Sequence, residues 1–189
     1  MFDEIQAKHL NFCRQKFNRY RNTANPSDIN ECIEHLNKFI SLWPQSSEGK
    51  DVAQVLAFLN TIRGGIQGTL EVVEGDFSDY DSWDDTPDAF VIVSNNNQQE
   101  FLRTKVVNND RHPKFGERKS YTWQINSKPL IFSVSDAEIL GNPRSLLTQE
   151  VNLSGFFGFE NLNGKLQKSA GCWLSIKFEH AALPACPWR

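Results

Sequence analysis

Apolar side chains recur at helical spacing through the first third of the chain. The repeat covers three segments, at about residues 2–21, 26–43 and 52–62. Asn25 followed by Pro26 is typical of a helix N-terminus, with a capping side chain and then proline at the first helical position. Pro44 ends the second segment, and Gly64-Gly65 ends the third. Because the connections are short, the pattern predicts a small bundle of three helices.

After Gly65 the pattern changes to short apolar runs of strand length, separated by turn-forming residues. Side chains alternate clearly in two of these runs, around Trp123 and around Leu174. Seven or eight such strands predict an antiparallel β-sandwich. The strands we expect are Thr69–Val73, Ala89–Val93, Phe101–Val107, Ser120–Ile125, Leu130–Val134, Leu146–Leu153 and Cys172–Phe178.

These two patterns divide the chain into a helical region at 1–66, a β-sandwich at 67–180 and a tail at 181–189. The fold class is therefore mainly β with α, and the sandwich carries about eight strands. Short apolar faces on the helices leave open a contact with a protein partner.

Composition and charge are those of a soluble globular protein. Hydrophobic residues make up 39% of the chain and charged residues 23%, and the net charge of −3 gives no support for nucleic-acid binding. No apolar run approaches the ~18 residues needed to span a bilayer. The acidic, amphipathic N-terminus lacks the basic and apolar regions of a signal peptide. We therefore expect a cytoplasmic protein.

The residue types used in catalysis are present without a catalytic pattern. Four scattered cysteines fit neither zinc spacing nor a disulfide framework, and we expect buried or free structural thiols. The four histidines are far apart in sequence, and no glycine-rich loop precedes a helix as phosphate capture requires. The sequence favours a non-catalytic protein.

The segment from Glu74 to Asp88 holds seven acidic side chains and no basic one. Such crowding of like charge is costly unless water solvates the loop or a cation neutralises it. Calcium takes 6–8 hard oxygen ligands from flexible loops, so it is the natural candidate cation. A solvated acidic loop is the competing interpretation.

Four stretches add a resemblance to a known family. They are Leu70-Glu-Val-Val-Glu, Asp88-Ala-Phe-Val, Thr104 to Glu117 with its His112-Pro113-Lys114-Phe115-Gly116-Glu117 core, and Leu130 to Glu138. Their order and spacing resemble the C2 domain family of protein kinase C and synaptotagmin, over residues of about 68–180. A first strand near Gly68 and a last strand closing at Phe178 resemble the phospholipase-type topology of that family.

The resemblance implies a weak calcium site. Asp88 matches the aspartate that opens the family's second strand, and Asp81 is its partner in the first loop. Asp136 and Glu138 match the two acids of the third loop. The family's last aspartate of that loop falls near Arg144 in this sequence, where no acid is present. A calcium-independent domain is the alternative.

The resemblance also implies membrane contacts. Apolar side chains among the acidic loops suit shallow insertion between lipid headgroups, although they could equally anchor the loops internally. Arg103 and Lys105, two apart on one expected strand, would face a headgroup together, unless they form an ordinary solvated strand face. The expected inserting residues are Phe77, Tyr80, Trp83, Ile139 and Leu140.

The sequence therefore predicts a non-catalytic binding module. We expect peripheral association with an anionic phospholipid membrane surface, with calcium as a possible cofactor. The alternative is a protein-protein interaction adaptor with a calcium-independent C2-like domain and helices that supply the contact surface.

Overall fold

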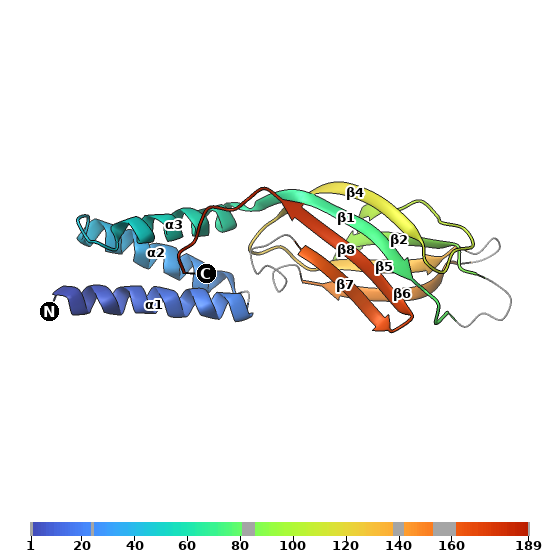
Figure 1. Ribbon diagram of the computed structural model, residues 1–189, viewed down its shortest axis with the longest axis horizontal. Coiled ribbons are helices and arrows are strands. Elements are labelled where there is room, and N and C mark those ends of the chain that lie inside the picture. Colours follow the sequence, from blue (N-terminus) through green and yellow to red (C-terminus); the bar gives the residue numbers. More distant parts are fainter. Residues whose placement is uncertain (1, 24, 81–85, 138–141, 153–161, 189) are drawn as a thin grey trace.

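Figure 1 shows a helical bundle at one end of a two-layered β-sandwich. The computed structural model describes residues 2–23, 25–80, 86–137, 142–152 and 162–188. The helices are α1 (Phe2–Thr23), α2 (Pro26–Leu42) and α3 (Gly49–Gly64). The strands are β1 (Ile66–Asp76), β2 (Ala89–Asn95), β3 (Glu100–Arg103), β4 (Lys114–Trp123), β5 (Leu130–Asp136), β6 (Arg144–Val151), β7 (Leu162–Ser169) and β8 (Cys172–His180).

The helices begin and end where the sequence places their signals. Asn25 caps α2, and its side-chain oxygen accepts a hydrogen bond from the Ser27 N–H at 3.1 Å. Helix α2 ends at Leu42, two residues before Pro44. The apolar stripes of the helices meet in a buried core that includes Phe17, Ile29, Leu36, Phe39, Phe58 and Ile62. No helix in the described part of the chain is long and apolar enough to cross a membrane.

One buried carboxylate ties α1 to α2. Asp28 lies in the first turn of α2 and is only 1% exposed. Its two oxygens lie 3.5 Å from Lys16 Nζ and 3.3 Å from Arg19 Nε, both on α1. The helix dipole also favours an acidic group in this turn. Asp28 therefore fixes the N-terminus of α2 against α1.

The sandwich consists of two four-stranded antiparallel sheets. The first sheet has the order β4-β1-β8-β7, and the second has the order β3-β2-β5-β6. The first and last strands pair side by side, with Gly68 opposite His180 and Leu70 opposite Phe178. This pairing confirms the predicted topology. It also places the start of β1 and the end of β8 together, at the end of the sandwich that adjoins the helices. The inner faces supply a shared core that includes Leu70, Val72, Val91, Val93, Phe132, Val134, Leu174, Ile176 and Phe178.

Three strands differ from the sequence expectation. The apolar pattern does not indicate strand β7, because its sequence Leu162-Asn-Gly-Lys-Leu-Gln-Lys-Ser169 shows little alternation. Strand β3 ends at Arg103 instead of continuing to Val107. At the next residue, the Thr104 hydroxyl oxygen, in place of a backbone carbonyl, accepts a hydrogen bond from the Val91 N–H of β2 at 2.9 Å. Strand β4 begins at Lys114, earlier than expected, and ends at Trp123.

The C-terminal tail returns to the helices (Figure 1). Cys186 is buried, and the Trp188 ring lies 6.4 Å from the Phe17 ring of α1. The Arg14 guanidinium lies 5.5 Å from the centre of the Trp188 ring. Residues 181–188 thereby connect the last strand of the sandwich to the bundle. All four cysteines are buried thiols outside any disulfide, as the sequence predicts.

Replacing the buried carboxylate tests the tie between α1 and α2. We expect Asp28→Asn to lower the free energy of unfolding by about 1–3 kcal/mol, since the charge-assisted contacts to Lys16 and Arg19 weaken. Asp51→Asn, an exposed first-turn acid of α3, is the matched control and should change stability by less than about 0.5 kcal/mol. Urea denaturation measures both. Equal effects would contradict a role for Asp28 in joining the helices.

The helices also predict a response to acid. His9 packs against His35 and Trp43, at 5.7 Å and 5.4 Å between ring centres, and its Nδ1 atom is buried without a partner in the described part of the chain. Burial, followed by the charges of His35 and Lys38, lowers the pKa of His9 from its ordinary value near 6.5. The unfolded chain then binds the proton more readily, so stability should fall as the pH drops below about 6.5. Thermal melts at several pH values should show a shallower fall in His9→Gln, and an identical slope in the two proteins would contradict this.

Candidate functional site

The candidate site lies at the end of the sandwich away from the helices, which we call the loop end. It is formed by residues 76–80, 86–89, 104–113, 136–137, 144–145 and 168–172. Backbone hydrogen bonds hold these segments together. The Phe77 N–H donates to the Arg111 carbonyl at 2.7 Å, and the Ala137 N–H donates to the Asp88 carbonyl at 2.9 Å.

Asp88 and Asp136 come together at this end, as the sequence predicts. The Asp88 backbone N–H donates to Asp136 Oδ1 at 2.7 Å, and Asp88 Oδ1 accepts from the Asn109 N–H at 2.7 Å. Asp136 is only 7% exposed. Its second oxygen, Oδ2, accepts from the Tyr80 hydroxyl at 2.8 Å. Both oxygens of Asp136 are thus used by donors of the protein itself.

Arg144 completes this arrangement from the neighbouring strand. In the antiparallel register of β5 and β6, Arg144 pairs with Asp136. Its guanidinium lies 4.9 Å from the centre of the Tyr80 ring, a cation–π contact. Tyr80 therefore links the two, with its hydroxyl on the carboxylate and its ring face against the guanidinium.

The described residues do not by themselves fit a calcium ion. Calcium needs 6–8 oxygen ligands. Three of the four carboxylate oxygens of Asp88 and Asp136 already accept hydrogen bonds from the protein. The described part of the chain contains no group of three histidine, cysteine or acidic side chains placed to hold a metal. Asp81 and Glu138, the other two predicted ligands, lie outside the described residues.

The remaining described acids of the loop end are also held by hydrogen bonds. Asp76 accepts from the Ser78 N–H at 2.9 Å and lies 3.5 Å from the His112 ring. Burial opposes ionisation of Asp76, but the Ser78 hydrogen bonds and the His112 charge outweigh it and lower its pKa. Asp79 accepts from the Ser169 hydroxyl and from the Gly171 N–H. These carboxylates brace the loops.

Phe77 is not a membrane-inserting residue, so that prediction is wrong. Its side chain is fully buried in the sandwich core. The ring fills the space beside Gly75, where an added Cβ atom would lie 2.7 Å from the ring carbons. Tyr80 is partly buried and packs against the core, so it anchors the loop end. Trp83, Ile139 and Leu140 lie outside the described residues.

Arg103 and Lys105 are both exposed on either side of the buried Thr104, and their contact with a headgroup stays a prediction. Arg103 ends β3, and its guanidinium pairs with Glu100 at 2.7 Å. Lys105 lies beyond the strand, in the segment that leads to β4. Between them, the Thr104 hydroxyl accepts a hydrogen bond from the Val91 N–H, and the Thr104 N–H donates to the Val91 carbonyl at 3.0 Å. Of the two cations, only Lys105 belongs to the loop end.

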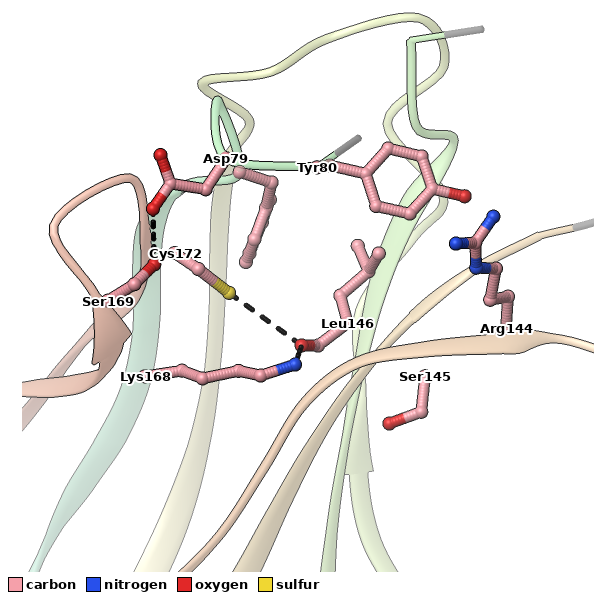
Figure 2. A pocket seen from close by; sticks show the side chains of 9 residues that line it. Asp79, Tyr80, Arg144, Ser145, Leu146, Lys168, Ser169 and Cys172 are labelled. Atoms are coloured by element: carbon pink, nitrogen blue, oxygen red, sulfur yellow. Dashed lines mark hydrogen bonds between the residues drawn. The ribbon is translucent and has the colours of Figure 1, made fainter. Parts of the chain in front are cut away.

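A pocket at the loop end was not predicted from the sequence (Figure 2). Its volume is about 350 Å³, and it opens between β6 of the second sheet and the β7–β8 hairpin of the first. Burial raises the pKa of the Cys172 thiol in its wall. The strand β7 that supplies Lys168 and Ser169 carries no clear sequence signal. The lining residues are Phe77, Asp79, Tyr80, Arg144, Ser145, Leu146, Lys168, Ser169 and Cys172.

The Tyr80 hydroxyl gives a test of this geometry. Tyr80→Phe removes the donor to Asp136 Oδ2, and we expect the free energy of unfolding to fall by about 1–3 kcal/mol because a largely buried carboxylate loses a partner. In millimolar calcium, Tyr80→Phe should also show a larger rise in melting temperature than the unchanged protein does, since one carboxylate oxygen becomes more available to a cation. Tyr121→Phe, a partly buried tyrosine of β4, is the control for loss of a hydroxyl. No loss of stability in Tyr80→Phe would contradict the assignment.

A family match and similar solved structures both support the C2-like fold. The C2 domain family matches residues 68–169. No curated protein sequence matches the chain. Human GIVD cytosolic phospholipase A2 aligns with 61% of this chain and 16% of its own, at 18% identity and a TM-score of 0.53. A C2 domain of plant Extended Synaptotagmin 1 aligns with 64% of this chain and 97% of its own, at 17% identity and a TM-score of 0.53.

A third similar structure extends over the helices as well. It comes from a study titled "CC2D1B coordinates ESRCT-III activity during the mitotic reformation of the nuclear envelope", and it aligns with 97% of this chain and 87% of its own, at 16% identity and a TM-score of 0.50. At such identities the likeness concerns the fold alone. The family match, the paired first and last strands and the two four-stranded sheets agree, and the chain belongs to the C2 domain family.

Proposed function

We propose that this protein is a non-catalytic binding module that associates peripherally with anionic phospholipid surfaces through its loop end, without requiring calcium. C2 domains commonly bind membrane lipids or proteins, so a membrane surface and a protein partner are the two candidate ligands. The observation that carries the proposal is an exposed apolar side chain, Val106, in a loop-end stretch of the chain that also carries the exposed cations Lys105, Arg111 and Lys114. Val106 is 45% exposed and lies in the segment between β3 and β4.

The cations around Val106 have no acidic partner in the described part of the chain. Lys105, Arg111 and Lys114 are all exposed, and none forms an ion pair with a described carboxylate. We call Lys105, Val106, Arg111 and Lys114 the basic rim. Asp110, the acid of this segment, accepts a hydrogen bond from the His112 N–H at 2.8 Å. The rim therefore offers positive charge and one apolar side chain to a ligand surface.

The expected electrostatic contribution is sufficient for reversible binding. A lysine or arginine near an anionic bilayer contributes about 1 kcal/mol, so three contribute about 3 kcal/mol before the apolar contact of Val106 is added. Shallow contact of a single valine is a small term. Binding should therefore be weak, reversible and sensitive to salt.

The proposed contact of the basic rim with the membrane does not use Asp88 or Asp136, the two described residues among the predicted calcium ligands. Asp136 is held by Tyr80 and by the Asp88 backbone, and Arg144 brings a positive charge beside it. A bridging cation at Asp136 would lie beside that positive charge, which opposes its binding. The segment 81–85 holds three further aspartates outside the described residues, and comparing vesicle binding in calcium and in chelator measures their contribution.

A second candidate function is a protein-interaction adaptor. Its supporting observation is that the CC2D1B structure aligns with the helices as well as with the sandwich. Leu42 of α2 is 53% exposed and Ile5 of α1 is 45% exposed, so the bundle leaves apolar side chains for a partner. Loss of vesicle binding under all conditions would favour this candidate.

Vesicle co-sedimentation tests the proposed function. We expect binding to phosphatidylcholine vesicles that contain phosphatidylserine, equal in calcium and in chelator, and no binding to phosphatidylcholine alone. Reversing the rim charges in Lys105→Glu/Arg111→Glu/Lys114→Glu should remove at least about 3 kcal/mol of binding, on the order of a hundredfold in affinity.

The matched control is Lys8→Glu/Lys38→Glu/Lys50→Glu, which changes the net charge equally but lies on the exposed faces of the helices. It should bind nearly as the unchanged protein does. Binding that appears only with calcium would contradict calcium independence. Equal losses in both triple variants would show that net charge, and not the loop end, governs the association.

A further inference from the structure

The second sheet ends in an open edge along strand β6. In the order β3-β2-β5-β6, strand β6 comes last, so one of its two sides has no neighbouring strand in the described part of the chain. A groove with a volume of about 450 Å³ follows this strand. The groove is continuous with the loop-end pocket, because both are lined by Ser145, Leu146 and Lys168. The proposed membrane contact through the basic rim does not use this edge.

The strand register shows which backbone groups of β6 face the open side. In an antiparallel sheet, successive residues direct their backbone N–H and C=O groups alternately to the two sides of the strand. The Ala137 N–H donates to the Asp88 carbonyl, so the odd-numbered residues of β5 bond to β2 and the even-numbered ones bond to β6. Those even-numbered residues lie opposite Leu147, Gln149 and Val151. The N–H and C=O groups of Thr148 and Glu150 therefore point out of the sheet.

Strand β6 lacks the sequence features that usually protect an edge against pairing. Edge strands commonly carry proline or lysine, or a bulge that turns the edge away. The sequence Arg144-Ser-Leu-Leu-Thr-Gln-Glu-Val151 contains neither proline nor lysine. The irregularity in its pairing with β5 falls between Ser145 and Leu147, so the part that follows is regular. An added strand would find two donors and two acceptors there, on the exposed residues Thr148 and Glu150.

Contacts between the two sheets close the groove at its loop end. The Leu146 carbonyl oxygen accepts from Lys168 Nζ at 3.3 Å and from Cys172 Sγ at 3.7 Å, and Figure 2 shows both contacts as dashed lines. Leu146 belongs to the second sheet, whereas the two donors belong to the first. Because these contacts use the Leu146 carbonyl, a strand that adds to β6 would pair beyond it, toward Glu150.

The charges along this edge select the partner. The side chains that line the groove include one cation, Lys168, and no acid. Lys168 forms no ion pair with a described carboxylate, and its ammonium keeps two donors beside the bond to Leu146. Glu150, toward the other end of the strand, is exposed and has no ion pair with a described residue. An acidic side chain near Lys168 and a basic one near Glu150 would match both.

We propose that the open edge of β6 binds an extended segment of a protein partner, which adds to the second sheet as a further strand with an acidic side chain at Lys168. In strand addition, backbone hydrogen bonds supply affinity and alternate side chains supply specificity. Thr148 and Glu150 provide the backbone groups. Leu146 and Leu147, which line the groove, provide an apolar contact for the side chains that turn inward. The edge shares no residue with the basic rim, so the protein would hold a membrane and a partner together.

Amide hydrogen exchange of the full chain tests the backbone assignment. Measured residue by residue by NMR, the amides of Thr148 and Glu150 should exchange faster than those of Leu147 and Gln149. Peptides for the binding test are selected on the full chain from a phage-displayed library of random dodecapeptides, and synthetic copies are titrated by fluorescence anisotropy. A bound peptide should slow exchange at Thr148 and Glu150.

Proline at two neighbouring positions separates pairing at the open edge from pairing inside the sheet. Thr148→Pro removes an outward N–H, so peptide affinity should fall by about tenfold or more while the melting temperature changes little. Thr148→Ala keeps that N–H and is the matched control, with unchanged affinity. Gln149→Pro removes an N–H that bonds to β5, and it should lower the melting temperature clearly.

Lys168→Gln tests the charge. Affinity for an acidic peptide should fall by about threefold, as expected for loss of one exposed ion pair. Lys165→Gln is the matched control, because Lys165 lies on the same strand but contacts the Trp173 ring at 3.7 Å and does not line the groove. The triple variant of the basic rim should bind the peptide as the unchanged protein does. Failure of the vesicle experiment therefore leaves this test intact.

Three outcomes would overturn the proposal. The first is that the library yields no binding peptide. The second is that the selected peptides bind Thr148→Pro as tightly as the unchanged protein, or leave exchange at Thr148 and Glu150 unaltered. The third is dimerisation in analytical ultracentrifugation that Thr148→Pro abolishes, because this would assign the edge to a second copy of the chain.

Discussion

The pairing of the first strand with the last determines where every other part of this protein lies. Because β1 and β8 run side by side, the chain enters and leaves the sandwich at the same end. The helices attach at that end through Gly65, and the tail returns to them with Trp188 against Phe17. The opposite end is left without helical cover, and it carries the ionisable side chains of the loops. The separation of a helix-covered end from an exposed loop end follows from one strand pairing.

At the loop end, the described acids and bases have different roles. Each described acid accepts hydrogen bonds from nearby donors, as Asp136 does from the Tyr80 hydroxyl and the Asp88 N–H. Desolvation makes a buried carboxylate costly unless such donors surround it, so these groups stabilise the loops. The cations remain at the periphery, where Arg144 and Lys168 keep unused donors. Positive charge therefore remains exposed at the described loop end, as the proposed contact with an anionic surface requires.

The sequence predicted the elements whose local signals agree with their environment. Asn25 and Pro26 mark the start of α2, and alternation around Leu174 marks β8, because both elements bury a regular face. The sequence-based prediction failed where contacts between residues far apart in the chain determine the position of a side chain. Phe77 sits among acidic residues in sequence, yet the space beside Gly75 buries it. The pocket could not be foreseen, since Leu146 and Lys168 meet only when the edges of two sheets close.

The position of Arg144 is where the described part of this loop end departs from the pattern that the resemblance implied. The resemblance places an acid near this position, and this chain has a guanidinium, a local change of two charge units. The β5–β6 register sets Arg144 opposite Asp136, and Tyr80 contacts both. A divalent cation at Asp136 would lie close to that positive charge, which opposes its binding. An anion at Arg144 would not meet that repulsion, since the cation–π contact leaves the guanidinium N–H groups available. This difference in charge is what supports the proposed calcium independence.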